Sequence, residues 1–334
     1  MAISNDLLSS TLYSIRDSEV DQLYRKTAFL DLCKQNGGIE YEDGGIKIQR
    51  PLSVIDHSTI TSLPTGYEPV SLAVSDVLRP AIYEWSDFVA PIVITKKEEM
   101  ENQSEKAIVK IVEARMKNVM SMLRREINRQ VLAGNSTTLT TLNSLNGEAS
   151  TTGFLEAGAA APATQTNTVG GLQKSALNVP GWYNSFLQGT AGTVVDDMTQ
   201  VYQDCQQFSP FGDVRAIIVN PATFAAYKAA LFSNERFINE KTLDGGRLQL
   251  AFAGAAVEQD NEMPANGGAA TRFSAVMLNF EGIKMVMHPD GDYSVGPFEH
   301  ISGTTARAAQ LYWKGQLIAD HLGSQGTLDN GEAW

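Results

Sequence analysis

Cysteine, basic charge and long apolar runs are all scarce in this chain. The 334 residues include only Cys33 and Cys205, too few for a disulfide scaffold and in keeping with a reducing compartment. No apolar run approaches the roughly 18 residues of a membrane-spanning helix, and the first residues carry no signal segment, so we expect no membrane contact and synthesis in the cytoplasm. The 26 basic and 38 acidic residues give a net charge of −12, which argues against a free-standing nucleic-acid binder.

Motifs for catalysis, metals and nucleotides are missing as well. The histidines at positions 57, 288, 300 and 321 lack the spacing of a metal site. Cys205 falls on the apolar face of a predicted helix, which favours a buried, inert thiol over a nucleophile. Residues 290–294 begin like a calcium loop, but Val295 and Ile301 replace the required glycine and the closing glutamate, so an ordinary turn is expected. We predict no catalytic residue, no cofactor and no metal: not an enzyme.

The first half of the chain has an extended organisation. Apolar residues at helical spacing over 1–36, closing at Gly37, predict a thin amphipathic arm. Short alternations between 46 and 95, interrupted by a turn-rich stretch, predict one long two-stranded hairpin. Residues 97–133 contain neither proline nor glycine and carry one apolar stripe, which predicts a helix of order 50 Å in length. Thr95 and Glu98 have capping-box spacing at its start, and Gly134 suits its end.

The second half has a more compact pattern. Residues 135–193 are rich in Ser, Thr, Gly and Ala and hold only three charged side chains, Glu148, Glu156 and Lys174; such a stretch is either mobile or held down by something else. A helix follows over 195–208, then a buried strand at 216–219 and a helix capped by Asn220 and Pro221. Further strands are expected around 275–280, 283–287 and 310–320, with turns at 264–268 and 289–292.

The predicted hairpin has apolar residues that nothing adjacent in the sequence covers. A two-stranded hairpin is marginal in water by itself, so we infer that neighbouring copies cover it and that the chain is a self-assembling structural subunit. On this interpretation Trp85→Asp leaves the subunit folded but blocks particle formation. The apolar residues concerned are Val54, Ile55, Leu72, Val74, Val77, Leu78, Ile82, Trp85 and Phe88.

This order of parts resembles the major capsid proteins of tailed bacteriophages with the Hong Kong 97-type fold. The resemblance covers roughly residues 80–325, and its motifs are individually short. They are a Val-Gly-Gly-Leu run at 169–172, Trp-Tyr-Asn at 182–184, Ile-Ile-Val-Asn-Pro-Ala-Thr-Phe at 217–224, Phe-Ala-Gly-Ala-Ala-Val at 252–257, Met-Pro at 263–264, Met-Leu-Asn-Phe at 277–280 and Tyr-Trp-Lys-Gly-Gln-Leu at 312–317.

The resemblance implies an α+β fold in five parts. These are an N-terminal arm (1–45), an E-loop hairpin (46–95), a P domain (96–192) with a spine helix over about 97–133, an A domain (193–292) and a return to the P domain (293–334). It also implies an icosahedral shell of hexamers and pentamers around packaged double-stranded DNA. The expected location is the virion, assembled in the bacterial cytoplasm. The expected partners are further copies of the chain, a portal and possibly a decoration protein.

Two further expectations follow from that resemblance. The hairpin starts near residue 46, which leaves no room for a long scaffolding segment, so a separate scaffold protein is expected. The net charge of −12 suggests a shell lining that contacts DNA non-specifically and lets it slide. Three alternatives remain open from the sequence: the shell protein of an encapsulin compartment, an enzyme whose site the spacing does not reveal, and a surface or fibre protein.

Overall fold

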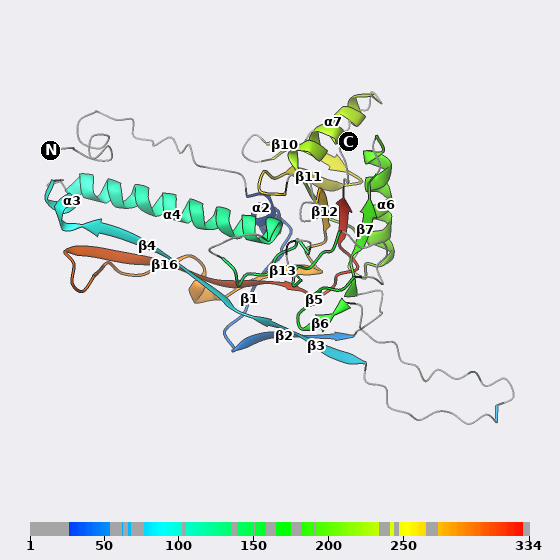
Figure 1. Ribbon diagram of the computed structural model, residues 1–334, viewed down its shortest axis with the longest axis horizontal. Helices are drawn as coiled ribbons and strands as arrows, with labels where there is room; N and C mark the ends of the chain where they lie inside the picture. The colour runs from blue at the N-terminus through cyan, green and yellow to red at the C-terminus, as the bar shows by residue number, and fades with distance from the viewer. Residues whose placement is uncertain are drawn as a thin grey trace.

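The computed structural model describes residues 27–53, 62, 66–67, 77–101, 105–134, 139–147, 149, 151–157, 165–174, 182–189, 192–233, 241–243, 247–264 and 273–329. Within these ranges it is a mixed α+β structure with an elongated part and a more compact part (Figure 1). Several predictions lie outside the described residues: the arm before residue 27, the turn beyond Pro264, His57, and the hairpin residues Val54, Ile55, Leu72 and Val74.

A six-stranded sheet forms the elongated part. Its centre is β16 (Ala306–Ala319), which pairs antiparallel with β4 (Ser86–Thr95) over ten residues. The other side of β16 pairs in turn with three shorter strands, and the sheet ends at the parallel pair of β1 with β13. The shorter strands are β13 (Ile283–Met287), β14 (Ser294–Val295) and β15 (Glu299–His300), and the edge strand is β1 (Ile39–Tyr41).

Helix is found in two described parts of the predicted long helical segment 97–133. These are α3 (Lys96–Glu101) and α4 (Glu105–Ala133), and α4 lies beside β4 and β16 (Figure 1). The capping box is present: the Thr95 backbone N–H donates to Glu98 Oε2 at 3.1 Å, and the Glu98 N–H donates to Thr95 Oγ1 at 3.4 Å. At the other end, Gly134 adopts φ +67°, the left-handed conformation that favours glycine after a helix.

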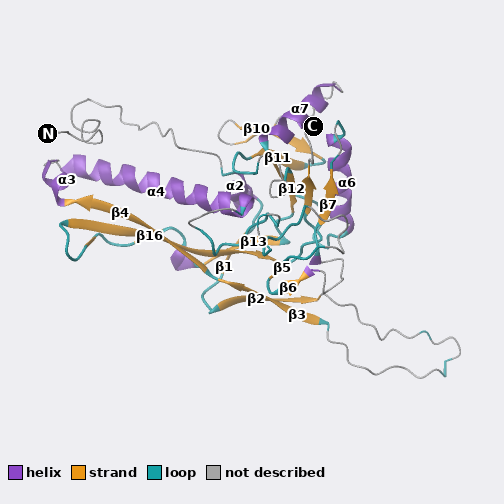
Figure 2. Ribbon diagram, in the orientation of Figure 1, coloured by secondary structure: helices purple, strands orange, loops and turns teal. Residues whose placement is uncertain are grey.

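A seven-stranded sheet forms the compact part, with helices packed beside it (Figure 2). The predicted buried strand at 216–219 is confirmed as β8, and Asn220 caps the next helix by accepting the Thr223 N–H at 2.8 Å. The strand order is β7 (Ser185–Gln188), β17 (Gly326–Asp329), β12 (Ala275–Leu278), β8 (Ala216–Val219), β11 (Ala255–Gln259), β10 (Arg247–Phe252) and β9 (Lys241–Leu243); the helices are α6 (Val194–Gln207) and α7 (Pro221–Ser233).

The last part of the predicted arm belongs to the core. Helix α2 (Ala28–Gln35) buries Phe29 and Cys33 completely, and the Phe29 ring lies 6.1 Å from that of Phe280. The prediction of a thin arm is therefore wrong from residue 28 onward. Helical spacing shows that one face is apolar, but the elements that cover this face lie about 100 to 250 positions away in the chain and give no local signal.

The hairpin is shorter than predicted. Strand β2 (Lys47–Ser53) pairs antiparallel with β3 (Leu78–Glu84), which confirms a hairpin base, but residues 86–95 form β4 and pair with β16 instead. The single hairpin over 46–95 is thus wrong in its last ten residues, because an alternating strand does not specify its partner. The two sheets also do not follow the predicted domain boundary at residue 292. Strand β13, before this boundary, lies in the six-stranded sheet, and β17, after it, lies in the seven-stranded sheet.

Candidate subunit contact surfaces

The outward side of the hairpin exposes apolar side chains. Leu78 is 62% exposed and Ile82 is 43% exposed, and their cross-strand partners are the polar residues Ser53 and Gln49. Alternate residues of β3, including Ala81 and Tyr83, point inward and are buried. The described part of the hairpin therefore has one face packed on its own subunit and one face, with Leu78 and Ile82, open for contact.

Two of the predicted contact residues are covered within the subunit. Phe88 is buried and stacks on Trp313, with ring centroids 5.5 Å apart and an interplanar angle of 12°. Trp85 packs partly against the core, donates from Nε1 to the Gly45 carbonyl at 3.0 Å, and has the Lys314 ammonium 5.6 Å from its ring centroid. Phe88 is therefore wrongly assigned to the contact surface, whereas Trp85 is half-buried against its own subunit.

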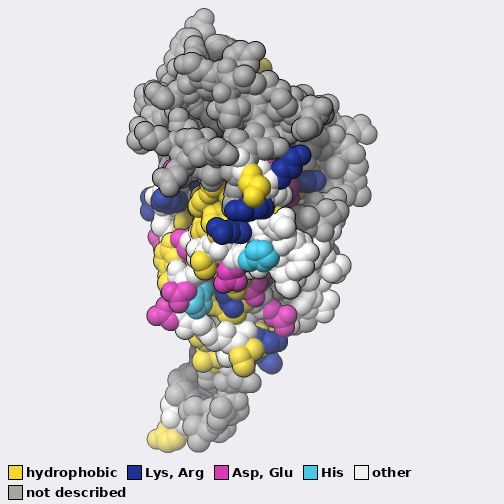
Figure 3. All heavy atoms as spheres, turned by 90° about the vertical axis from the view of Figure 1, so that its left-hand side faces the viewer, with side chains coloured by type: hydrophobic (Ala, Val, Ile, Leu, Met, Phe, Trp, Pro, Cys, Tyr) yellow, Lys and Arg dark blue, Asp and Glu magenta, His cyan; other side chains and the backbone are white. Residues whose placement is uncertain are grey.

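The outer face of β4 is a second exposed apolar surface. Val89 is 52% exposed and Val93 is 40% exposed, while Phe88 and Ile92 point to the other side of the strand and are buried. Seen end-on from the α3 end, apolar side chains lie among Lys, Arg, Asp, Glu and His instead of beside a single dense basic patch (Figure 3). Further exposed apolar residues occur near β14 and β15, namely Val295, Phe298 and Ile301.

An ion network fixes the base of the hairpin to the six-stranded sheet. Arg50 on β2 lies 3.0 Å from Glu40 and 2.8 Å from Glu42, and Lys284 on β13 lies 3.3 Å from Glu40 and 3.8 Å from Asp320. Burial alone would raise the pKa of Glu40, but the hydrogen bond and charge of Arg50 bring it below its ordinary value. Burial raises the pKa of Asp320. The hairpin base is thus held by charges from three segments of the chain.

The glycine pair of the low-charge stretch contacts the hairpin. Gly170 and Gly171 have φ +59° and +77° and connect β5 (Thr168–Val169) to β6 (Leu172–Gln173) in a two-residue turn. The Gly170 carbonyl accepts the Ile82 N–H at 2.9 Å. A Cβ at Gly170 would lie 2.8 Å from the Ala81 Cβ, so the position requires glycine both for its backbone conformation and for space.

Buried polar contacts hold the described part of the same stretch in place. The Lys174 side chain has no exposure; its ammonium lies 3.1 Å from Gln165 Oε1, 3.1 Å from Asn184 Oδ1 and 3.5 Å from Glu156 Oε1. The Glu156 carboxylate also accepts the backbone N–H groups of residues 166 and 167, at 3.0 and 2.8 Å. Of the two outcomes left open by the sequence, the described residues show a segment held down by its own polar groups.

The remaining candidate groups have structural surroundings. Cys205 is buried, as predicted, and burial raises the pKa of both Cys33 and Cys205 to about 12, which disfavours the reactive thiolate. His288 caps the predicted turn by accepting the Asp290 N–H at Nδ1, 3.2 Å away, and burial lowers the pKa of His321. In the described residues no group of three or more His, Cys, Asp or Glu could hold a metal, and no helix is long and apolar enough to cross a membrane.

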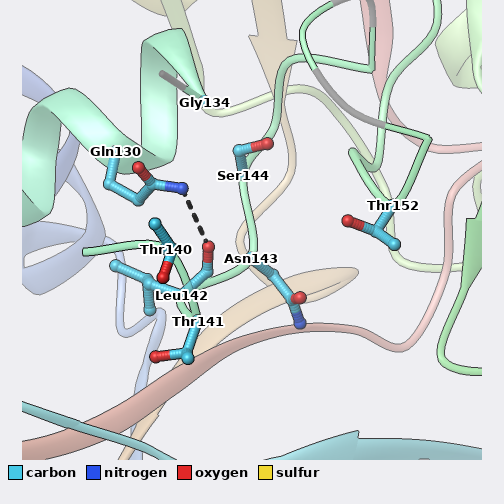
Figure 4. A pocket seen from close by; sticks show the side chains of 8 residues that line it. All are labelled: Gln130, Gly134, Thr140, Thr141, Leu142, Asn143, Ser144 and Thr152. Carbon is cyan, nitrogen blue, oxygen red and sulfur yellow. Dashed lines mark hydrogen bonds between the residues drawn. The ribbon is translucent and has the colours of Figure 1, made fainter. Parts of the chain in front are cut away.

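A small polar pocket lies at the end of α4 (Figure 4). Its volume is about 240 Å³, and one wall is fixed by Gln130, whose Nε2 donates to the Leu142 carbonyl at 3.1 Å. None of its eight lining residues is titratable, so they supply neither a general acid nor a base. The lining residues are Gln130, Gly134, Thr140, Thr141, Leu142, Asn143, Ser144 and Thr152.

The long helix along one sheet, the projecting hairpin and the second sheet with its helices can be compared as one arrangement with known folds. No family model matches the sequence, and no curated protein matches it. Solved structures do match. A chain of the cyanophage A-1(L) capsid asymmetric unit aligns with a TM-score of 0.63 at 14% identity, covering 96% of this chain and 97% of that one.

Two other matches represent two kinds of particle. The capsid of a native GTA particle aligns at a TM-score of 0.59 and 13% identity, with 96% of both chains covered. The SrpI encapsulin of Synechococcus elongatus aligns at 0.58 and 10% identity, covering 99% of this chain and 96% of that one. The chain therefore has the Hong Kong 97-type α+β fold, as the family resemblance of its sequence implies.

Proposed function

We propose that the chain is the major capsid protein of a tailed bacteriophage, which assembles into the hexamers and pentamers of an icosahedral shell around double-stranded DNA. The observation that carries the proposal is agreement with phage capsid subunits over nearly the whole of both chains. Exposed apolar side chains on the hairpin and on β4 support it, because they provide surfaces that further copies can cover. The proposed role is structural and not enzymatic.

The proposed division of the chain is an N-terminal arm (1–45), an E-loop hairpin (46–95), a P domain (96–192), an A domain (193–292) and a return to the P domain (293–334). The packing supports four modifications of it. Helix α2 and strand β1 pack with the core, and β4 goes with the P-domain sheet. Strand β7 goes with the seven-stranded sheet of the A domain, and β13 and β17 exchange places between the two sheets. The E-loop proper is then the β2–β3 hairpin and the residues between its strands.

The proposed partners are further copies of the chain, a separate scaffold protein, a portal, possibly a decoration protein, and packaged DNA. The proposed location is the virion, after assembly in the bacterial cytoplasm. The net charge of −12 supports non-specific, weak contact with DNA, since a strongly basic lining would retain it. A dense basic patch mapped on the inner wall of assembled particles would contradict this part of the proposal.

The second candidate is an encapsulin-type compartment, which the match to the SrpI encapsulin favours. Expression of the chain alone and with its neighbouring genes, followed by negative-stain electron microscopy, tests both candidates. Closed particles of uniform curvature support a shell protein, and packaged nucleic acid distinguishes a capsid from a compartment filled with protein cargo. A compact monomer, or a small discrete oligomer at high concentration, would contradict both candidates and favour an enzyme.

A further inference from the structure

Two Asn-Gly dipeptides lie among the described residues, at 36–37 and 146–147, and their surroundings are opposite. In this dipeptide the backbone nitrogen of glycine can attack the side-chain amide with little hindrance, because glycine has no Cβ beside the attacking nitrogen. The nitrogen, the asparagine Cγ and the three atoms between them close a five-membered ring. The sequence alone does not rank the two sites, since the reaction also requires that both groups be free to move.

Asn36 and Gly37 form the exposed C-terminal end of helix α2. Gly37 adopts φ +72°, and no atom beyond its chain neighbours lies within 4 Å of the place where a Cβ would be. Among the described residues no group accepts the Gly37 N–H, so this nitrogen is available. The Asn36 side chain donates from Nδ2 to the Leu32 carbonyl at 2.9 Å, a local contact that can open without disturbing the core.

Asn146 and Gly147 are enclosed and held. Asn146 is 0% exposed, its Oδ1 accepts the Ala149 N–H, and its Nδ2 donates to the Ala133 carbonyl, both at 3.3 Å. The Gly147 N–H donates to the Leu155 carbonyl at 2.8 Å, so the attacking nitrogen is already engaged. A Cβ at Gly147 would lie 2.6 Å from this carbonyl oxygen, which leaves the peptide no space to rotate toward Asn146.

We propose that Asn36 is a site of spontaneous deamidation in the folded chain and that Asn146, in the same dipeptide, is protected. A hydroxide ion of the solvent removes the Gly37 amide proton, and the nitrogen attacks Asn36 Cγ and forms a new C–N bond. The Cγ–Nδ2 bond breaks, and Nδ2 leaves as ammonia with a proton from water, which restores the hydroxide. Water then opens the succinimide at either carbonyl and leaves aspartate or isoaspartate. The proposal is independent of the proposed role in a shell.

Either product changes the connection from α2 to β1. Aspartate cannot donate to the Leu32 carbonyl, and it places a negative charge where the end of a helix favours a positive one. Isoaspartate adds one carbon to the backbone just before Gly38. Gly38 is fixed on both sides, because its N–H donates to the Cys33 carbonyl and its own carbonyl accepts the Met285 N–H, both at 2.8 Å. Deamidation is therefore expected to loosen the attachment of α2 to the six-stranded sheet.

The experiment compares the two sites in the full-length chain, incubated at mildly alkaline pH both folded and unfolded in guanidinium chloride. Mass spectrometry of tryptic peptides detects the replacement of an amide NH₂ by OH, and fragmentation assigns it to a residue. In the folded chain Asn36 is expected to convert at least about tenfold faster than Asn146, because reaction at Asn146 requires local unfolding. In the unfolded chain the two rates are expected to be similar. Asn36 that stays intact in the folded chain would overturn the proposal, as would equal rates at the two sites in the folded chain.

Two variants test the mechanism and its consequence. Asn36→Gln keeps the amide but needs a six-membered ring for the same attack, so position 36 is expected to keep its mass. Asn36→Asp reproduces one product and is expected to unfold at a lower denaturant concentration than Asn36→Gln. Ammonia loss at the wild-type rate from Asn36→Gln would overturn the ring closure, and equal unfolding midpoints of the two variants would overturn the effect on α2. These readouts come from the chain itself, whether or not particles form.

Discussion

Replacement of Leu78 by aspartate is expected to raise the protein concentration needed for particle formation while leaving the subunit folded. Leu78 is 62% exposed at the start of β3. Full burial of a leucine contributes about 1.5–3 kcal/mol, so its remaining burial beneath a neighbouring copy would contribute roughly 0.9–1.9 kcal/mol per subunit. The folding of the isolated subunit depends only on the part already buried, which is worth roughly 0.6–1.1 kcal/mol.

The aspartate adds a second cost at the interface. A carboxylate enclosed by a neighbouring copy without a partner costs several kcal/mol, which adds to the lost burial. Because about 1.4 kcal/mol corresponds to a tenfold change in an equilibrium constant, the concentration at which particles appear is expected to rise by at least about tenfold. Light scattering against protein concentration measures this threshold, and circular dichroism melting checks the fold.

The matched control is Leu78→Met, which keeps an apolar side chain of similar volume and is expected to assemble at nearly the wild-type concentration. The reasoning would be refuted if the aspartate variant assembled at the wild-type threshold. It would also be refuted if both variants lost assembly equally, because the effect would then not come from charge at a buried contact.

Three other outcomes are expected. Trp85→Asp should destabilise the subunit itself by on the order of 2 kcal/mol in urea titration, since the indole packs on its own core and donates to Gly45; an unchanged midpoint would contradict this. The hydrogen bond and charge of Arg115 lower the pKa of Glu98 from 4.5 to about 2, so stability present above pH 4.5 should decline as the pH falls toward 2. Glu98→Gln should flatten that decline in urea titrations at several pH values. The pKa values near 12 of Cys33 and Cys205 predict no reaction with a thiol reagent at pH 8 in the native chain and two equivalents after unfolding; rapid native labelling would contradict the burial.

The parts of the fold that could be predicted from the sequence are those with local causes. Thr95 and Glu98 lie three residues apart and form a capping box because both partners are in the same turn. Asn220 caps α7 for the same kind of reason, and Gly134 ends α4 through its own backbone conformation. In each case the residues that determine the structure are neighbours in the sequence.

The predictions that were wrong concern distant partners. The alternation over 86–95 shows that the segment is a strand, but only the ten-residue register with 306–315 makes it part of the six-stranded sheet. The sequence alone gives no residue that covers Phe88. In the structure Trp313, which is 225 positions later in the chain, stacks on it. The same reasoning explains α2, whose apolar face is evident in the sequence while the partner that buries it is not.

The buried cluster of the low-charge stretch did leave a signal in the sequence. Residues 135–193 contain three charged side chains, and two of them, Glu156 and Lys174, prove to be each other's partners at 3.5 Å. Isolated charges in an otherwise uncharged segment have little reason to be on a solvated surface, which normally carries many. Opposite signs also allow the two groups to be buried together at a lower cost than either alone. In a segment with very few charged residues, two residues of opposite charge can therefore be predicted to be buried together as an ion pair.

The positions of the two exposed apolar surfaces restrict how copies of the chain can meet. Leu78 is on the hairpin, whereas Val93 is near the far end of β4, beside α3, at the opposite end of the elongated part (Figure 1). Two different surfaces on one subunit favour heterologous contacts, in which the hairpin of one copy meets a different surface of the next. Such contacts close into rings only if the angle between the surfaces is fixed. The ion network around Arg50 fixes the base of the hairpin to the sheet that carries β4, and it thereby supplies the rigidity that closed rings require.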